Sequence, residues 1–520
     1  MPSVGDVIFI ALLGLLCFTP LSVRLLGDAG IGWHIRTGQE ILATHAIPGV
    51  DLFSSTMLDK PWLAWEWLYD ILVGGLDRAA GLNAVVLFTA LVIAAVFAWT
   101  FRLIVRRRTN LQLAVVLVML AASASMIHFL ARPHVLSWLF TVVWFWILDS
   151  TEKECLAGRT GKHSRILWSL PLPMLIWVNV HGGWLIGFAL LGIYWISALW
   201  IWFATGHNRV EGILLRLRLA RRARELAIVG VIAALTTLAN PYGWKLHSHI
   251  YHYLSNRFLM DHIDEFQSPN FHGVAQRCFA GLILIAFVAL GARARRERLS
   301  EGLVVLFAVY SGLVASRNIP VSSLLLVLVA GPLLSEAFAK IRWHRFLRWG
   351  RGAELRSAVP TFLARMGALE LGLRGHVWVV LAVVLSSWIV LHGGVAGSSR
   401  LMDAHFDATR FPVKAVDFVA QQGLPEPVLG PDYWGGYLIY RLYPTVQVVA
   451  DDRHDLYGEE FFKFYLKMVH VEPGWYTLIR EQGVRRVLMP KGSPVANILA
   501  ESVGWQMVYE DNVAVLFEKR

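Results

Sequence analysis

Long apolar segments recur from one end of the chain to the other, and they constrain its fold more than any other feature. A helix needs roughly 20 apolar residues to cross about 30 Å of hydrocarbon. Only 16% of the 520 residues are charged, whereas a soluble domain carries about a quarter. The pattern predicts a polytopic α-helical membrane protein with about eleven transmembrane helices. The predicted spans are residues 6–24, 82–101, 111–130, 134–149, 166–180, 183–204, 226–242, 278–292, 302–316, 319–338 and 376–395.

Basic residues in alternate loops give these spans an orientation. Five of the loops together hold more than half of the 48 Lys and Arg residues, and the positive-inside rule places them in the cytoplasm. The amino terminus is then cytoplasmic, the chain after residue 395 lies outside, and the protein is expected in the plasma (inner) membrane. The same rule accounts for the net charge of +11 without nucleic acid as a partner. One basic segment, residues 343–351, fits either an interfacial helix or a loop.

The composition changes after residue 395, where long apolar runs give way to mixed segments. "FPVKAVDFVAQQG" has the pattern of a helix that stops at a glycine. "TVQVVAD", "RRVLMP" and "WQMVYEDNVAVLFE" have the pattern of strands. We therefore expect a transmembrane domain, residues 1–395, with a first outer loop over 27–81. It is followed by a small extracytoplasmic α/β domain, residues 396–520, here called the tail.

Polar residues gather in five connections, all of which this topology places on the outer face. Each connection alone has a structural explanation, such as an interfacial arginine, a tight turn or a helix cap. Their convergence on one face predicts a single site. The residues are Asp28, His34, Arg36, Asp51 and Glu66 in the first outer loop, Arg132 and His134 in "ARPHVLSW", His181 in "NVHGG", the "NPYG" turn at 240–243, and Arg317 in "SRNIP".

Acids, arginines and histidines at the edge of a membrane suit the chemistry of a lipid-linked phosphate. Arginine binds phosphate oxygens bidentately and keeps its charge. A carboxylate can take the proton of an attacking hydroxyl. Arginines or a divalent metal ion can stabilise the charge that grows on a departing phosphate. These properties together favour sugar transfer from a polyprenyl-phosphate carrier whose lipid chain stays in the bilayer.

The motifs carry a family resemblance that covers most of the chain. The chain resembles the GT-C superfamily of membrane glycosyltransferases, which includes protein O-mannosyltransferases, aminoarabinose transferases and oligosaccharyltransferases. It also resembles uncharacterised bacterial membrane proteins that have the same motifs. The resemblance implies that Asp28 is a catalytic base or the ligand of a divalent metal ion. Ala29 stands where many GT-C enzymes have a second acid, so Asp51 and Glu66 are the candidates for that role. The motif residues are Asp28, Trp33-His34, Thr37-Gly38, Pro48, Asp51, Phe53-Ser54, Pro61-Trp62, Glu66-Trp67-Leu68, His181-Gly182-Gly183 and Asn240-Pro241-Tyr242-Gly243.

The tail has a resemblance of its own. "PDYWGGYLIYRLYPTVQVVADDRHDLYG" is similar to the oligosaccharyltransferase stretch in which a Trp-Trp-Asp-Tyr-Gly motif precedes a strand that ends in acids. The similarity implies acceptor binding by Trp434, Asp451 and Asp452, and the neighbouring Arg453 is a further candidate. The alternative is a Gly-rich turn that leads into a core strand.

The favoured interpretation is an inverting glycosyltransferase with a polyprenyl-phosphate sugar as donor and a glycan, lipid or protein as acceptor. His34 would orient the donor or acceptor in this interpretation. Two alternatives stay open. A transporter or flippase of a lipid-linked substrate predicts polar residues along the bundle interior and broken helices. A non-catalytic membrane assembly protein predicts a tail that binds a partner. The predicted donor-binding residues are Arg36, Arg132, His134, His181 and Arg317.

Overall fold

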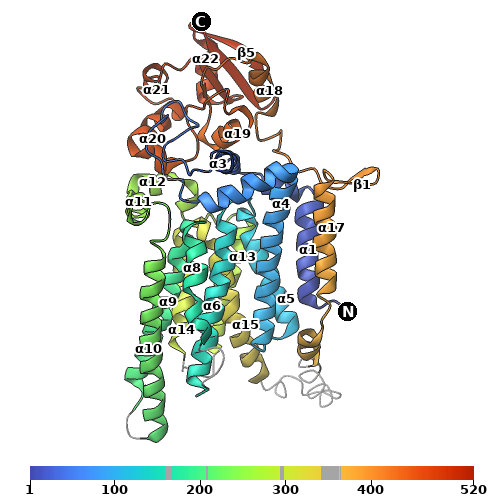
Figure 1. Cartoon of the computed structure of the whole chain (residues 1–520), viewed down its shortest axis with the longest axis vertical. Helices are drawn as coiled ribbons and strands as arrows, with labels where there is room; N and C mark the ends of the chain where they lie inside the picture. Colours follow the sequence, from blue (N-terminus) through green and yellow to red (C-terminus); the bar gives the residue numbers. More distant parts are fainter. Residues whose placement is uncertain (160–164, 207–208, 293–297, 341–361, 363–364) are drawn as a thin grey trace.

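The computed structural model describes the whole chain except residues 160–164, 207–208, 293–297, 341–361 and 363–364. Long helices form a bundle, and the tail lies against one end of it, which we call the tail-side end (Figure 1). The amino terminus lies at the opposite end, as expected for a tail and an amino terminus on different faces. The basic segment 343–351 lies outside the described residues.

Each of the predicted spans coincides with a helix. Among the described residues, six helices are long and apolar enough to cross a membrane, or seven if the bent pair Arg365–Gly372 and Val377–Leu391 is one span. The number of about eleven spans is therefore not confirmed, because several helices are short and α10 begins in a basic segment that the sequence assigns to a loop. The helices are α1 (Val4–Phe18), α4 (Trp67–Arg106), α5 (Leu111–Ser125), α6 (His134–Leu156), α8 (Pro171–Val178), α9 (Leu185–Ala204), α10 (Val210–Thr236), α13 (Val274–Ala292), α14 (Leu299–Val314), α15 (Ile319–Lys340) and α17 (Val377–Leu391).

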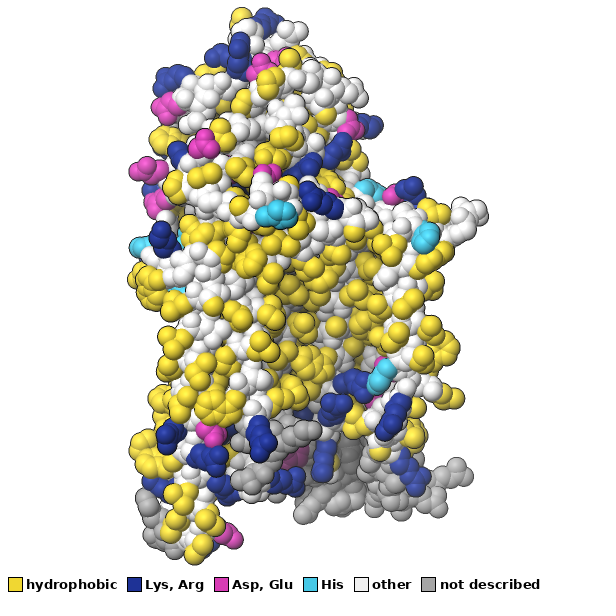
Figure 2. All heavy atoms as spheres, viewed as in Figure 1, with side chains coloured by type: hydrophobic (Ala, Val, Ile, Leu, Met, Phe, Trp, Pro, Cys, Tyr) yellow, Lys and Arg dark blue, Asp and Glu magenta, His cyan; other side chains and the backbone are white. Residues whose placement is uncertain are grey.

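Helix α15 is central to the bundle. Its residues 324–330 are all buried, and it packs against α5, α13 and α14. A helix that is apolar all round belongs inside a bundle or a membrane. Apolar side chains also cover the outside of the bundle (Figure 2), with exposed examples such as Leu284 and Leu306. Together these features are those of an integral membrane protein.

Helix α4 bends where the predicted first outer loop ends. Gly81 has φ +65°, a conformation that favours glycine. The segment before the bend runs across the tail-side end, and the segment after it runs along the bundle (Figure 1). The bend holds the start of α4, next to Glu66, against α3 (Gly30–Thr44). Short elements complete this end: α2 (Leu21–Leu25), η1 (Met126–His128), η3 (Gly182–Trp184), α11 (Trp244–Ser255), α12 (Arg257–His262), η4 (Asp264–Phe266) and η5 (Ser316–Asn318). A further short element, η2 (Leu167–Ser169), precedes α8 and packs against α6, α8 and α10.

The tail contains a four-stranded sheet of order β3-β4-β6-β5, in which β3 and β4 are parallel and the other pairs antiparallel. The predicted helix before Gly423 and the predicted strands near the carboxyl terminus are present. The predicted strand "TVQVVAD" is wrong, because Val448 makes only isolated bridges to Ser54 and Val428. The elements are β1 (Val395–Ala396), β2 (Ser399–Arg400), α18 (Val413–Gln422), β3 (Val428–Leu429), α19 (Asp432–Leu442), α20 (His454–His470), α21 (Thr477–Glu481), β4 (Arg486–Pro490), α22 (Pro494–Glu501), β5 (Trp505–Glu510) and β6 (Ala514–Lys519).

The glycines of "YWGGY" lie in helix α19 and not in the predicted turn. A Cβ added to Gly436 would overlap the carbonyl oxygen of Ala29, and one added to Gly32 would overlap that of Gly436. Helices α3 and α19 therefore meet backbone to backbone, which only glycine permits. This contact fixes the first loop against the tail.

Candidate active site

Arg132 lies at the centre of a group of carboxylates at the tail-side end. Its Nη1 donates to Asp28 Oδ2 at 2.9 Å and to Glu265 Oε1 at 3.4 Å, and its Nη2 lies 3.9 Å from Asp452 Oδ2. The three acids come from the first loop, from η4 and from the tail. One guanidinium thus faces three carboxylates, and its side chain keeps 22% of its surface exposed.

The acids around Arg132 differ in their pKa values. Burial alone would raise the pKa of Glu265, but Arg132 and Arg317 lower it to about 2. Burial raises the pKa of Asp452 to about 7, because the attraction of Arg132 is opposed by the charges of Asp28 and Asp451. Near neutral pH, Glu265 is therefore ionised, whereas Asp452 is present in both its protonated and its ionised form.

Asp28 and Asp452 approach each other across the start of α3. A Cβ on Gly30 would lie 3.0 Å from Asp28 Oδ1 and 2.6 Å from Asp452 Oδ2. Asp28 Oδ1 accepts the Gly30 N–H at 2.8 Å, and Trp33 Nε1 donates to Asp452 Oδ1 at 3.0 Å. A second acid does lie beside Asp28, but the tail supplies it, and the sequence candidates Asp51 and Glu66 do not.

Glu66 forms a second group with two imidazoles. Its Oε2 lies 3.7 Å from His34 Nε2, and its Oε1 lies 3.9 Å from His181 Nε2. His34 is fully buried, and its Nδ1 contacts Asp70 Oδ1 at 2.6 Å. Burial raises the pKa of Glu66 to about 8 and lowers the pKa of His34 well below its ordinary value.

His134 and Arg317 complete the tail-side end of the bundle. His134 Nε2 lies 2.9 Å from the carbonyl oxygen of His128. The Arg317 guanidinium lies over the Phe266 ring, 4.6 Å from its centroid. Because Arg317 lowers the pKa of Glu265, it contributes positive charge to the surroundings of Arg132.

Asp51, Asp451 and Arg453 form a buried ion-pair cluster that connects the first loop to the tail. Arg453 Nη1 donates to Asp51 Oδ1 at 2.6 Å and Nη2 donates to Asp451 Oδ2 at 2.7 Å, with 1% of the arginine side chain exposed. Asp51 also accepts from the Ser54 hydroxyl at 2.5 Å. This enclosure favours a structural role over the acceptor binding expected from the sequence.

Trp434 and Arg36 also hold the tail in place. Trp434 is buried, and its Nε1 donates to the carbonyl oxygen of Arg410 at 2.9 Å. Arg36 Nε donates to the carbonyl oxygen of Tyr440 at 2.8 Å, so α3 is bonded to the end of α19. Neither side chain belongs to the group around Arg132.

Among the described residues, no group of three or more His, Cys, Asp or Glu side chains is arranged to hold a metal ion. Asp28, the metal candidate from the sequence, faces Arg132 instead. The guanidinium lies between the carboxylates of Asp28 and Asp452.

Sequence reasoning missed two residues of these groups. Glu265 lies in "IDEF", a short helical turn without a recognisable motif. Asp70 follows Glu66 by four residues, and this i, i+4 spacing on a helix could have indicated it.

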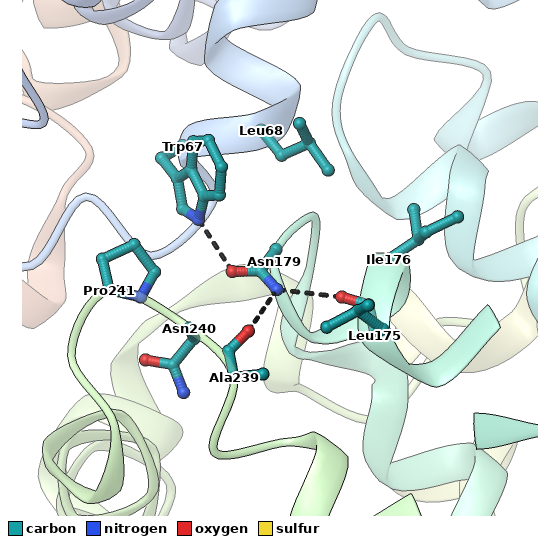
Figure 3. A pocket seen from close by; sticks show the side chains of 8 residues that line it. All are labelled: Trp67, Leu68, Leu175, Ile176, Asn179, Ala239, Asn240 and Pro241. Atoms are coloured by element: carbon teal, nitrogen blue, oxygen red, sulfur yellow. Dashed lines mark hydrogen bonds between the residues drawn. The ribbon is translucent and has the colours of Figure 1, made fainter. Parts of the chain in front are cut away.

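An apolar groove of about 480 Å³ lies between the start of α4, the end of α8 and the turn after α10 (Figure 3). Asn179 bridges it, accepting from Trp67 Nε1 at 2.8 Å and donating to the carbonyl oxygen of Ala239 at 3.0 Å. The groove thus joins the "EWL", "NVHGG" and "NPYG" motifs. It is lined by Trp67, Leu68, Leu175, Ile176, Asn179, Ala239, Asn240 and Pro241.

Neither a protein-family model nor a curated protein matches the sequence. Solved structures do match. The Archaeoglobus fulgidus oligosaccharyltransferase in the apo form aligns over 94% of this chain and 69% of its own, with a TM-score of 0.53 and 10% identity. The same enzyme tethered with an acceptor peptide containing the NVT sequon aligns over 94% and 68%, with a TM-score of 0.52 and 11% identity. ArnT from Cupriavidus metallidurans in the apo state aligns over 99% and 96%, with a TM-score of 0.50 and 16% identity.

At these identities the likeness concerns the fold. The chain has the fold of the GT-C superfamily of membrane glycosyltransferases, to which both enzymes belong. The resemblance expected from the sequence is confirmed at this level.

Proposed function

We propose that the protein is a membrane glycosyltransferase that moves a sugar from a polyprenyl-phosphate-linked donor to an acceptor. The observation that carries the proposal is Arg132, a partly exposed guanidinium at the tail-side end of the bundle, surrounded by carboxylates. An arginine in this setting can exchange a carboxylate for a phosphate, because both present two oxygens in the same geometry.

Phosphate binding would change the partners of Arg132. Donor phosphate oxygens would take the place of Asp452 on the guanidinium. As the bond between the sugar C1 and the phosphate oxygen breaks, negative charge grows on the phosphate, and Arg132 and Arg317 would stabilise it. In a single displacement the acceptor attacks the opposite face of C1, so the product has inverted configuration. Asp28, with one oxygen on Arg132 and the other on the Gly30 N–H, would position the guanidinium.

The groove supports a lipid-linked donor over a water-soluble one. Its lining is mostly apolar, and Leu175 and Ile176 remain 38% and 44% exposed on α8. An apolar lining can replace the lipid tails that surround an isoprenoid chain in the bilayer, through van der Waals packing. The chain would lie in the groove while its phosphate reaches the group around Arg132.

The proposed location is the outer face of the plasma (inner) membrane. Lys and Arg side chains gather at the end opposite the tail (Figure 2), which the positive-inside rule assigns to the cytoplasm. The transmembrane domain of residues 1–395 and the extracytoplasmic tail of residues 396–520 stay as proposed divisions. The acceptor peptide tethered to the A. fulgidus enzyme is a reason to include peptides among the acceptors tested.

The test is sugar transfer from a panel of radiolabelled polyprenyl-phosphate sugars to host membranes. We would compare the wild type with Asp28→Asn, Arg132→Lys and the control Arg400→Gln. Arg400 is a matched arginine because it also pairs with an aspartate, Asp403, but is 62% exposed. Transfer by the wild type and by the control, with weaker donor binding in the two site variants, is expected. No transfer from a panel that includes the host's own lipid-linked sugars would overturn the proposal.

A further inference from the structure

Glu66 has an environment that differs on its two sides. His181 Nδ1 accepts the N–H of Gly183 at 3.0 Å, so a neutral His181 must carry its proton on Nε2. That Nε2–H faces Glu66 Oε1 at 3.9 Å. A donor on this side stabilises the carboxylate form of Glu66.

The other side presents an acceptor. Asp70 Oδ1 lies 2.6 Å from His34 Nδ1, and an ionised Asp70 holds the proton of a neutral imidazole on that nitrogen. His34 Nε2 is then a lone pair that faces Glu66 Oε2 at 3.7 Å. Among the described residues this fully buried nitrogen makes no hydrogen bond. A lone pair on this side stabilises the protonated form of Glu66.

A hollow of about 10 Å³, roughly the size of one water molecule, lies next to Glu66. Its walls come from the first loop, from the start of α4 and from the tail, and include Trp33, Trp62, Trp65, Arg453 and Asp455. Only 10% of the Glu66 side chain is exposed. The hollow can receive a hydroxyl group at the carboxylate, and the indole rings keep bulk water away from it.

We infer that Glu66 is the catalytic base of the proposed transfer, that the acceptor is an alcohol, and that His34 and His181 act on Glu66 in opposite directions as positioning residues. This inference rests on the proposed function. The distances of 3.7 and 3.9 Å are longer than hydrogen bonds, as is common for catalytic pairs before substrate binds.

The step balances without a further reactant. The acceptor oxygen forms a bond to the sugar C1, and its proton moves to the Glu66 carboxylate. The bond between C1 and the phosphate oxygen breaks, and its electron pair stays on the phosphate. The products are the glycosylated alcohol and the polyprenyl phosphate, and Glu66 afterwards returns the proton to solvent.

Other charges act on Glu66 as well. Arg132 and Arg317 favour its carboxylate form, while Asp455 and Glu265 favour its protonated form. Asp70 faces His34, and Arg453 lines the hollow. These groups are unchanged in the variants below, so shifts between variants report on the two imidazoles.

Asparagine offers a matched pair of variants. In His181→Asn the amide oxygen can replace Nδ1 and keep the Gly183 N–H, while the Nε2 donor is lost. In His34→Asn the amide N–H₂ can replace Nδ1 and keep Asp70, while the Nε2 lone pair is lost. We expect the ascending limb of kcat against pH, near pH 8 in the wild type, to move to higher pH in His181→Asn and to lower pH in His34→Asn.

Glu66→Gln provides the second measurement. We expect kcat to fall by about 10² to 10⁴-fold with the donor KM within about twofold. Asp28→Asn should instead mainly raise the donor KM. Glu472→Gln, an exposed tail variant, is the control. If Glu66→Gln retained its kcat, the inference would be overturned. It would also be overturned if the ascending limb of the kcat–pH profile stayed in place, or moved in the same direction, in both histidine variants. The proposed function fails separately, when the wild type transfers no sugar.

Discussion

Asp452 Oδ2, from the tail, lies 3.9 Å from Nη2 of Arg132, at the start of a bundle helix. The two residues are 320 positions apart in the chain, and only the folded arrangement brings the second acid to the site. The tail is therefore part of the candidate active site and not only a module beside it. A carboxylate in this position competes with a donor phosphate for the same guanidinium.

Asp452 should make donor binding depend on pH. Its pKa is raised to about 7 by burial, so it is neutral below that pH and charged above it. Donor KM in the wild type is expected to rise by about tenfold between pH 6 and pH 8, because the charged carboxylate competes for Arg132. In Asp452→Asn this rise should disappear. Equal KM profiles in both proteins would contradict the competition.

Arg132→Lys should weaken the site without removing its charge. Lysine is a point charge and cannot bind two phosphate oxygens in a fork. We expect kcat/KM for the donor to fall by about 10² to 10³-fold, measured as initial rates of radiolabel transfer. A fall of less than about threefold would show that the guanidinium geometry is not used.

The contact between α3 and α19 should not tolerate a methyl group. Gly32→Ala and Gly436→Ala each place a Cβ into a backbone carbonyl group, and the expected loss is about 1–3 kcal/mol in the free energy of unfolding. Thermal unfolding in detergent measures it. Gly14→Ala on α1, where a Cβ meets nothing within 4 Å, is the control and should not be destabilised.

Asp51→Asn should destabilise the protein at neutral pH by about 3 kcal/mol, because it leaves Arg453 with one buried carboxylate fewer. Burial alone would raise the pKa of Asp51, but Arg453 and Ser54 lower it below its ordinary value. A lowered pKa gives stability that is present above the unfolded value of about 3.9 and lost as pH falls through the folded value. The difference between wild type and variant should therefore shrink in acid. A constant difference in thermal midpoint from pH 7 to pH 3 would be the contrary result.

A bulky residue in the groove should discriminate between donors by chain length. Ile176→Trp would fill part of the 480 Å³ space, so KM should rise more for a long isoprenoid donor than for a short one. Leu172→Trp lies on the same helix, is 65% exposed and does not line the groove. It should leave the ratio of the two KM values unchanged.

The sequence predicts local features well and long-range pairings poorly. Apolar runs give the positions of the bundle helices because burial in a membrane needs only composition and length. The turn around Arg132 is found because basic residues are concentrated in the predicted cytoplasmic loops, so an arginine in a short outer turn stands out. Asp452 beside Asp28, and Arg453 on Asp51, depend on tertiary packing, for which spacing in the chain contains no signal.

Helix α19 shows why a local rule can mislead. Two consecutive glycines favour a turn by intrinsic propensity, since each costs roughly 1 kcal/mol in a helix. Here the helix forms because Gly436 allows contact with the backbone at Ala29 and Gly30. The burial of Trp434 and Tyr437 on the same helix offsets the unfavourable propensity.

The backbone contact of Gly32 with Gly436 determines which parts of the molecule can move together. Helix α3 is also bonded to the tail through Arg36 and Trp33, although the chain enters it directly from the membrane. Because α3 also packs closely against α4, a displacement of the tail would be transmitted through α3 to the start of α4. The tail is in this way mechanically connected to both groups of the candidate site, the one around Arg132 and the one around Glu66.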